Sequence, residues 1–176
     1  MQVPTSRLFA AGDILSGAAL NQAVTSFGNF FMGKPICILR QTVAQSTSTG
    51  TSVNLTFTTE DIDRDSGHST TTNTDRYTAQ TPGYYRVTAT CVWEATATGG
   101  ARQIQIMKNA GAVNGSFQRY QHTAVSSVTS ITTTALVYFN GSTDYVTAEV
   151  LQTSGALNTR VTAPEQSSMI IEWVSL

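Results

Sequence analysis

Apolar and polar residues alternate near the middle of the chain, in the stretch RYTAQTPGYYRVTATCVW (residues 76–93). Every odd position from Tyr85 to Trp93 is apolar, whereas the even positions between them are polar except at Val92. Successive side chains of a β-strand point to opposite faces, so this period of two predicts a strand with one face in a core.

Further strand-like segments follow Pro35, and turn residues such as NAGAVNG and NGSTD separate them. The polar stretch 59–75 lies between two of these segments and is predicted to be a loop. Together the pattern predicts an all-β sandwich. The expected strands are CILRQTV (37–43), SVNLTFT (52–58), ARQIQIMKN (101–109), GSFQRYQHT (115–123), SITTTALVYFN (130–140), DYVTAEVLQT (144–153) and SSMIIEWVSL (167–176).

The last of these strands is apolar on both faces. One face carries Met169, Ile171 and Trp173, and the other carries Ile170, Val174 and Leu176. In a two-layer sandwich one face of each sheet looks outward, so the second set needs a cover from elsewhere. A neighbouring subunit is the simplest cover, and we expect Ile170, Val174 and Leu176 to form a subunit interface.

A helical period precedes the strands. Apolar residues recur at steps of four, three and four, at Leu20, Val24, Phe27 and Phe31. This spacing predicts a helix over about residues 17–32 with one apolar stripe. Ser16 is a suitable N-cap and Gly33 a suitable end. Two interpretations stay open at this point: the stripe packs on its own domain, or it packs on sister subunits or a larger structure.

Composition narrows the function classes. Only 12% of the 176 residues are charged and the formal net charge is −1, so the chain lacks the basic footprint of a nucleic-acid-binding protein. No segment approaches the ~20 apolar residues of a membrane span, and we expect no membrane insertion. Cys37 and Cys91 each lie in an expected strand, where a reducing cytoplasm favours small buried apolar residues over a disulfide.

Candidate chemistry is sparse. The chain contains none of the common catalytic motifs and only two histidines, so we expect neither catalysis nor a cofactor. The acidic run EDIDRD places Asp61, Asp63 and Asp65 in a pattern that partly matches an oxygen-ligand calcium loop, although the glycine falls one place late. These carboxylates are weak candidate metal ligands, and the alternative is that they cap turns in an irregular connection.

The pattern Tyr77-x5-Gly83-x-Tyr85-x-Val87 resembles the core signature of the globular head of complement subcomponent q and its tumour-necrosis-factor relatives. The later segments VYFNGSTDYVTAEV and SSMIIEWVSL are similar to that family too. The resemblance implies a ten-strand-type jelly roll that forms tight trimers. The sequence departs from the family where Tyr77 and Val87 replace phenylalanines, and no collagen-like stalk precedes the head.

The segment before the strands carries a second resemblance. AGDILSGAALNQAVTSFGNFFMGKP (residues 11–35) resembles the short starts of phage virion proteins, notably minor tail proteins of phages that infect actinobacteria. Their heads contain a motif, TED…D…H…TNT.R, which implies a place on a virus particle. It is matched here by Thr59, Glu60, Asp61, Asp65, His68, Thr72, Asn73, Thr74 and Arg76.

The main hypothesis is therefore a non-enzymatic phage virion protein, made in the host cytoplasm, on the tail or the capsid. Residues 1–35 would attach it to other virion proteins, and residues 36–176 would form the trimeric jelly-roll head. The alternative is a receptor-binding tip that recognises a host surface glycan. A third hypothesis is a bacterial jelly-roll module without a connection to a virus.

Overall fold

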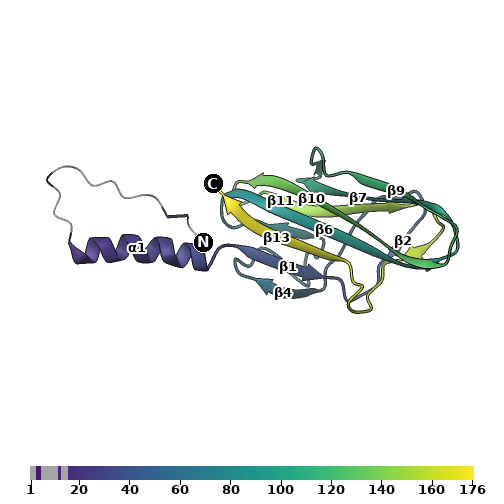
Figure 1. The fold of residues 1–176 in the computed structure, drawn as a ribbon, viewed down its shortest axis with the longest axis horizontal. Helices are drawn as coiled ribbons and strands as arrows, with labels where there is room; N and C mark the ends of the chain where they lie inside the picture. Colours follow the sequence, from purple (N-terminus) through teal and green to yellow (C-terminus); the bar gives the residue numbers. More distant parts are fainter. Residues whose placement is uncertain (1–2, 5–11, 13–15) are drawn as a thin grey trace.

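Two antiparallel sheets face each other in the computed structural model, and one helix projects from an end of this sandwich (Figure 1). The structure describes residues 3–4, 12 and 16–176. The helix is α1 (Gly17–Met32). The strands are β1 (Ile36–Arg40), β2 (Ser46–Thr47), β3 (Val53–Asn54), β4 (Thr59–Asp63), β5 (Arg76–Thr78), β6 (Gly83–Thr96), β7 (Gly100–Lys108), β8 (Gly111–Ala112), β9 (Gln118–His122), β10 (Ser127–Phe139), β11 (Tyr145–Gln152), β12 (Leu157–Asn158) and β13 (Ser168–Ser175).

Strands far apart in the sequence lie side by side in both sheets. The five-stranded sheet has the order β10-β6-β13-β1-β4. The six-stranded sheet has the order β3-β11-β7-β8, with β5 added on β11 and β9 on β7. A short pair, β12 with β2, stands apart from both. The chain therefore passes back and forth between the two sheets, as from β6 to β7 and from β10 to β11. This is the jelly-roll arrangement that the head signature implied.

The core lies between the two sheets and confirms the alternation in residues 76–93. On β6 the odd positions from Tyr85 to Trp93 are all fully buried. At Val92, where the alternation breaks, the chain after β12 runs beside β6. The Val92 N–H donates to Ser167 Oγ at 3.0 Å, and the Arg160 N–H donates to the Val92 carbonyl at 2.8 Å. The Val92 side chain is buried as well, at 6% exposure.

The polar stretch 59–75 is not one continuous loop, as the sequence had suggested. Its first five residues form β4, which pairs with β1 along the edge of the five-stranded sheet. The sequence T-E-D-I-D has one apolar residue, so no period of two marked it. The strand forms because the N–H and carbonyl groups on the open edge of β1 need hydrogen-bond partners, and the backbone of residues 59–63 supplies them.

The predicted strand at 52–58 is shorter than expected and survives only as β3. Leu55 and Phe57 are fully buried, which explains the apolar pattern. Their N–H groups, however, donate to the carbonyls of Ala148 and Thr74, which belong to different parts of the chain. Residues 55–58 are therefore a buried extended connection. Burial of alternate side chains does not by itself produce the regular hydrogen bonds of a β-strand.

Helix α1 has the predicted bounds. Ser16 Oγ accepts a hydrogen bond from the Ala19 N–H at 3.1 Å, and the Gly33 N–H donates to the Asn29 carbonyl at 2.9 Å. The helix touches the head through Phe30, whose ring packs edge-on against Trp173 at 4.8 Å between centroids. Capping and this single buried contact hold the helix at the end of the sandwich.

The predicted apolar stripe of α1 does not pack on the head of its own chain. Phe27 is 37% exposed, and the exposure rises to 44% at Leu20, 63% at Val24 and 64% at Phe31. The interpretation that the stripe covers its own domain is therefore wrong. Phe30, which lies beside the stripe, makes that contact instead.

Candidate assembly interface

The outward face of the five-stranded sheet is the most unusual surface of the described chain. On β6, β10 and β13 the even positions point outward, opposite the buried odd positions. Many of these outward positions carry apolar or aromatic side chains that are more than a third exposed. They are Tyr84, Leu136, Tyr138, Ile170 and Val174, with Leu176 just beyond the last strand.

The strand register brings these side chains together. Tyr84 stands opposite Tyr138, and their rings meet edge-on with centroids 5.3 Å apart. Val174 lies at a bulge in β13 directly beside Tyr84. Farther along, Ile170 stands opposite Ile38 of β1. The apolar residues therefore spread across neighbouring strands of this face, with the Arg86–Glu172 pair between Tyr84 and Ile170.

Threonines continue this face toward the other end of the sheet. Thr88 and Thr134 stand opposite each other with their hydroxyl oxygens 3.0 Å apart, and Thr90 and Thr132 likewise at 2.8 Å. Each hydroxyl thus has a partner within the sheet, which leaves the methyl groups free to meet another surface. A polar group that already has a hydrogen bond costs little to bury.

An ion pair lies between the apolar side chains of this face. Arg86 Nη1 lies 3.6 Å from Glu172 Oε2, and the two residues stand opposite each other on β6 and β13. Both side chains are well exposed in the single chain, where such a pair contributes little to stability. These two opposite charges form a neutral pair between the apolar side chains of the face.

Sequence reasoning found part of this face. The structure places Ile170, Val174 and Leu176 on it, exposed at 40%, 39% and 65% in the single chain. Tyr84, Leu136 and Tyr138 were missed. The segment ITTTALVYF held the signal, since Leu136 and Tyr138 are apolar residues that alternate with the inward-facing Ala135, Val137 and Phe139.

The head-signature residues lie in the core behind this face. Tyr77, Tyr85 and Val87 are fully buried. The Tyr85 hydroxyl donates to the Thr81 carbonyl at 2.8 Å. Burial raises the pKa of Tyr77 far above its usual range, and the carboxylate of Asp65 beside it adds to that effect. These tyrosines are therefore neutral core residues, each with a partner for its hydroxyl.

Gly83 begins β6 in a conformation that suits only glycine. Its φ is +140°, and a Cβ there would lie 2.4 Å from Trp173 Nε1 and 2.5 Å from the Ser175 carbonyl oxygen. The indole N–H of Trp173 also donates to the Pro82 carbonyl at 3.0 Å. The glycine thus lets β6 and β13 meet closely at the end of the sheet that carries α1.

The three acidic candidates do not converge on one site. Asp61 pairs with Arg40, Asp63 accepts a hydrogen bond from the His68 N–H at 2.9 Å, and Asp65 accepts one from the Tyr77 hydroxyl at 2.8 Å. Burial raises the pKa of Asp65, although the bond from Tyr77 opposes the shift. Among residues 3–4, 12 and 16–176, no group of three or more acidic, histidine or cysteine side chains is placed to hold a metal ion.

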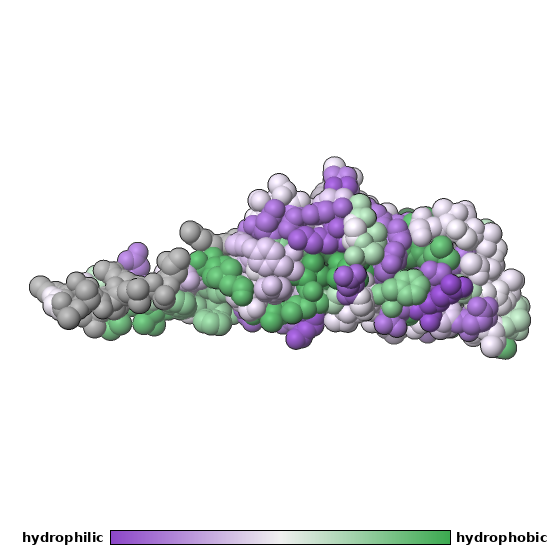
Figure 2. Space-filling view, turned by 90° about the horizontal axis from the view of Figure 1, so that it is seen from above, coloured by the Kyte–Doolittle hydropathy of each residue, from purple (hydrophilic) through white to green (hydrophobic). Residues whose placement is uncertain are grey.

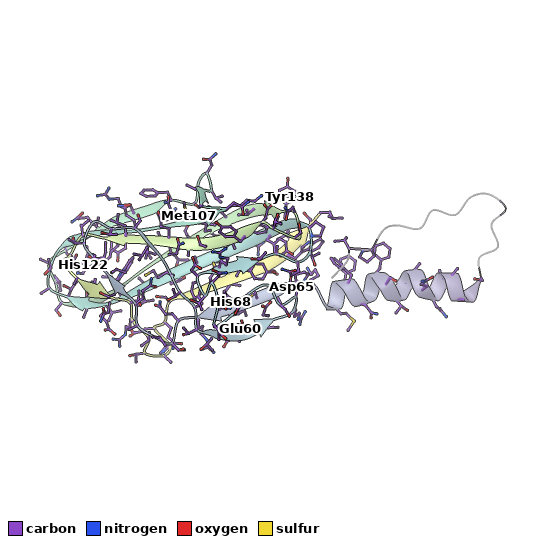
Figure 3. The ribbon with its side chains drawn as sticks, turned by 180° about the vertical axis from the view of Figure 1, so that it is seen from behind. Glu60, Asp65, His68, Met107, His122 and Tyr138 are labelled. Carbon is purple, nitrogen blue, oxygen red and sulfur yellow. The ribbon has the colours of Figure 1, made fainter. Side chains whose placement is uncertain are left out.

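Both histidines have structural partners. His68 Nδ1 lies 2.8 Å from Glu60 Oε1 and its Nε2 lies 3.2 Å from the Thr74 carbonyl, so it joins β4 to the loop that follows (Figure 3). His122 Nε2 lies 3.2 Å from the Thr96 carbonyl, at the end of the head remote from α1. Neither has a serine or cysteine nucleophile among these partners.

The cysteines behave as predicted. Cys37 and Cys91 are free and fully buried, and burial raises the pKa of both thiols.

In the part of the chain that the structure describes, the helix is too short and too polar to cross a membrane.

The sequence matches no protein-family model and no curated protein. Among solved structures, the chain is similar to murine APRIL at pH 5.0, with a TM-score of 0.54 and 9% identity, over 78% of this chain and 98% of that one. It is also similar to the Eiger TNF of S. frugiperda, with a TM-score of 0.54 and 11% identity, over 81% of this chain and 96% of that one. The fold is thus a jelly roll of the tumour-necrosis-factor type.

Proposed function

We propose that this chain is a non-enzymatic structural protein that assembles as a homotrimer through the outward face of its five-stranded sheet. The observation that carries the proposal is the set of exposed aromatic and aliphatic side chains on that face, which lie on both sides of the Arg86–Glu172 pair, with Tyr84 and Tyr138 on one side and Ile170 on the other. Large exposed apolar patches on a soluble chain mark interaction surfaces.

The chemistry of the face suits another copy of itself. Its apolar side chains gain about 25 cal/mol for each Å² removed from water. The hydroxyls of Thr88, Thr90, Thr132 and Thr134 are already paired, and Arg86 and Glu172 neutralise each other, which lowers the polar desolvation that opposes the contact. The resemblance of the head signature to the complement and tumour-necrosis-factor family implies three copies around one axis.

The proposed place of this trimer is a phage particle, as a minor tail protein or a capsid appendage. Its support is the resemblance of residues 11–35 to the starts of minor tail proteins and the match to their head motif. The position of α1 agrees with this role, because the helix projects beyond the head (Figure 1). Residues 1–35 would join the trimer to other virion proteins.

A charge at the α1 end of the patch tests the assembly. We expect Val174→Asp to convert the full chain from a trimer to a monomer, measured by size-exclusion chromatography with light scattering at micromolar concentration. Val125→Asp is the matched control, since Val125 is exposed at 60% in a loop away from this face. A monomeric parent chain, or a trimer that tolerates Val174→Asp as well as the control, would refute the assembly.

The place on a particle needs a separate experiment. An antibody against the head is expected to label purified virions of the encoding phage at fixed positions in electron micrographs. Label on the tail would identify a tail protein, and label on the shell would identify a capsid appendage. Virions that carry no label and no peptide of this chain by mass spectrometry would contradict a virion role.

A second candidate role, recognition of a host surface glycan, has support from one shallow hollow on the six-stranded sheet. Phe117 is 52% exposed at its edge. Gln105 and Glu149 also line it, and Gln105 Nε2 donates to Glu149 Oε1 at 2.6 Å. An exposed ring beside amide and carboxylate groups is the chemistry that binds sugars, by stacking and by hydrogen bonds.

Adsorption to host cells distinguishes this role from a purely structural one. The labelled trimer is expected to bind cells or a glycan array, and Phe117→Ala is expected to abolish the binding without changing the trimer. Val125→Asp again serves as a control. A trimer that binds neither cells nor glycans would leave the structural role alone.

A further inference from the structure

The exposed stripe of α1 has the spacing of a coiled coil. Leu20, Val24, Phe27 and Phe31 follow each other at steps of four, three and four, which is the alternation of d and a positions in a heptad. A seam of this kind is completed when equivalent residues of other helices interdigitate with it. All four side chains are more than a third exposed in the single chain.

The sequence of the helix predicts low stability in isolation and no binding to a charged surface. It has 16 residues and includes Gly17 and Gly28, and isolated helices of this length are marginal in water. It carries no Asp, Glu, Lys or Arg side chain. Identical copies can therefore pack side by side without repulsion between like charges, whereas a charged partner finds no complement.

The connection between α1 and the head brings the stripe close to the proposed trimer interface. Three residues, 33–35, join the helix to β1, so the link spans at most about 10 Å. The Pro35 carbonyl accepts a hydrogen bond from the Trp173 N–H at 3.0 Å, so the link already follows β13. Arg64 Nη1 also donates to the Met32 carbonyl at 3.0 Å, which holds the last turn of the helix against the head.

The apolar end of the interface is the end that carries the helix. Tyr138 lies at the side of the head next to α1 (Figure 3). The space-filling view shows apolar surface along one side of the helix and on the adjoining end of the head (Figure 2). Three heads packed through this face bring their helices together at the same axis.

We propose that α1 forms a parallel three-stranded coiled coil with the α1 helices of the two sister copies. The occupant of the stripe is thus a second and a third copy of this chain, and the inference rests on the proposed trimer. The helices run in the same direction because a rotation axis relates the three copies. Phe30 lies about a quarter turn from the stripe at 3.6 residues per turn, so it can hold the head while the stripe faces the axis.

This stem changes what attaches the trimer to a particle. Its apolar seam is occupied by sister helices and is not free to dock on another protein. The surface that other virion proteins can reach is the polar side of the helix, with Asn21, Thr25 and Asn29. Attachment then depends on hydrogen bonds to this polar side or on the chain before Ser16.

Disulfide trapping in the full chain tests the stem. Leu20→Cys places a thiol at the seam, far from the head, and Thr25→Cys places one on the polar side as the matched control. Cysteines bridge only when their Cα atoms approach within about 7 Å. The native thiols of Cys37 and Cys91 are fully buried and do not compete. We expect Leu20→Cys to form covalent dimers at least about tenfold faster than Thr25→Cys under mild oxidation.

Light scattering of the reduced variants separates the two proposals. Trimers that trap Leu20→Cys and not Thr25→Cys support the stem. Trimers in which both variants react at the same rate, or neither reacts, refute the stem and leave the trimeric head intact. A monomeric chain refutes the head assembly, and the stem with it.

Discussion

The two sheets have similar inner faces and very different outer ones. Both inner faces are buried and apolar, as at Val87 on the five-stranded sheet and Ile104 on the six-stranded sheet. The outer face of the six-stranded sheet carries mostly polar side chains, among them Gln103, Gln105 and Glu149. The outer face of the five-stranded sheet carries aromatic rings, aliphatic side chains and threonines. The alternation along a strand thus indicates which of its side chains face the core. The chemistry of the outward-facing side chains indicates whether that face contacts water or another protein surface.

The charges sharpen this contrast. On the six-stranded sheet, Lys108 Nζ lies 2.8 Å from Asp144 Oδ2 beside a turn. On the five-stranded sheet, Arg86 and Glu172 lie in the middle of the proposed interface. An ion pair in water contributes about 0–1 kcal/mol, whereas breaking a buried pair leaves a costly uncompensated charge. Removing one charge from each pair therefore tests whether the two outer faces differ in burial in the assembled protein.

The largest effect is expected from a change that breaks the five-stranded sheet itself. Gly83→Ala forces a Cβ into the Trp173 indole at a positive φ, and we expect it to lower the free energy of unfolding by about 4 kcal/mol. Gly115→Ala is the control: its φ is +81° and nothing lies within 4 Å of the added Cβ, so we expect about 1–2 kcal/mol. Urea unfolding at one protein concentration measures both.

Equal losses in the two variants would contradict the close contact of β6 and β13 at Gly83. An altered slope of the unfolding transition in Gly83→Ala would show instead that the folded or unfolded state had changed its compactness. The proposed trimer also depends on this contact, because Tyr84 follows Gly83 directly on the outward face.

A smaller effect is expected from removing one charge of each pair. Glu172→Ala leaves Arg86 without its partner, and in a buried interface we expect the trimer to weaken by about 3 kcal/mol per subunit. Lys108→Ala breaks a partly buried pair outside the proposed interface, and we expect it to change the free energy of association by less than about 1 kcal/mol. Sedimentation equilibrium over a range of concentrations measures the association of both variants.

Replacing both partners, Arg86→Leu with Glu172→Leu, completes this test. A buried pair exchanged for apolar residues is often neutral or stabilising, so the double variant is expected to recover the trimer that Glu172→Ala weakens. A trimer equally tolerant of Glu172→Ala and Lys108→Ala would mean that Glu172 stays in water and that this face is not the interface.

The sequence predicted the elements whose pattern is local. The alternation in β6 and the heptad-like steps in α1 both follow from repeats along one segment, and both have their expected bounds or burial. The signature residues Tyr77, Gly83, Tyr85 and Val87 lie in the core and at the start of β6, as the resemblance implied.

Other features depend on neighbours far along the chain, and no local repeat encodes them. Residues Thr59–Asp63 form β4 only because β1 offers an open edge. Phe30 is buried, although it lies off the helix stripe, because the link to β1 brings it to Trp173. The outward patch was only partly predicted for the same reason, since the register between β6 and β10 decides that Tyr84 and Tyr138 meet.

The smallest expected effects come from two carboxylic acids, one beside each sheet. Their pKa values are shifted in opposite directions. Burial raises the pKa of Asp65, after β4, above its ordinary value of 3.8, so its contribution to stability is greatest at low pH and is lost as the pH rises through the folded pKa. Burial also acts on Asp144, before β11, but bonds from Lys108 and Asn109 outweigh it and lower the pKa. Its contribution is present at neutral pH and is lost as the pH falls through the folded pKa.

Asn substitutions at these two positions turn the opposite shifts into a measurement. The free energy of unfolding of the parent minus that of Asp65→Asn is expected to fall between about pH 4 and neutral pH, because the parent loses the stabilisation of the protonated acid. The same difference for Asp144→Asn is expected to rise with pH below about 4 and then to stay constant. Urea unfolding at a series of pH values checks both. Parallel profiles would mean that water reaches Asp65 as freely as it reaches Asp144, and that the loop after β4 does not seal the core around Tyr77.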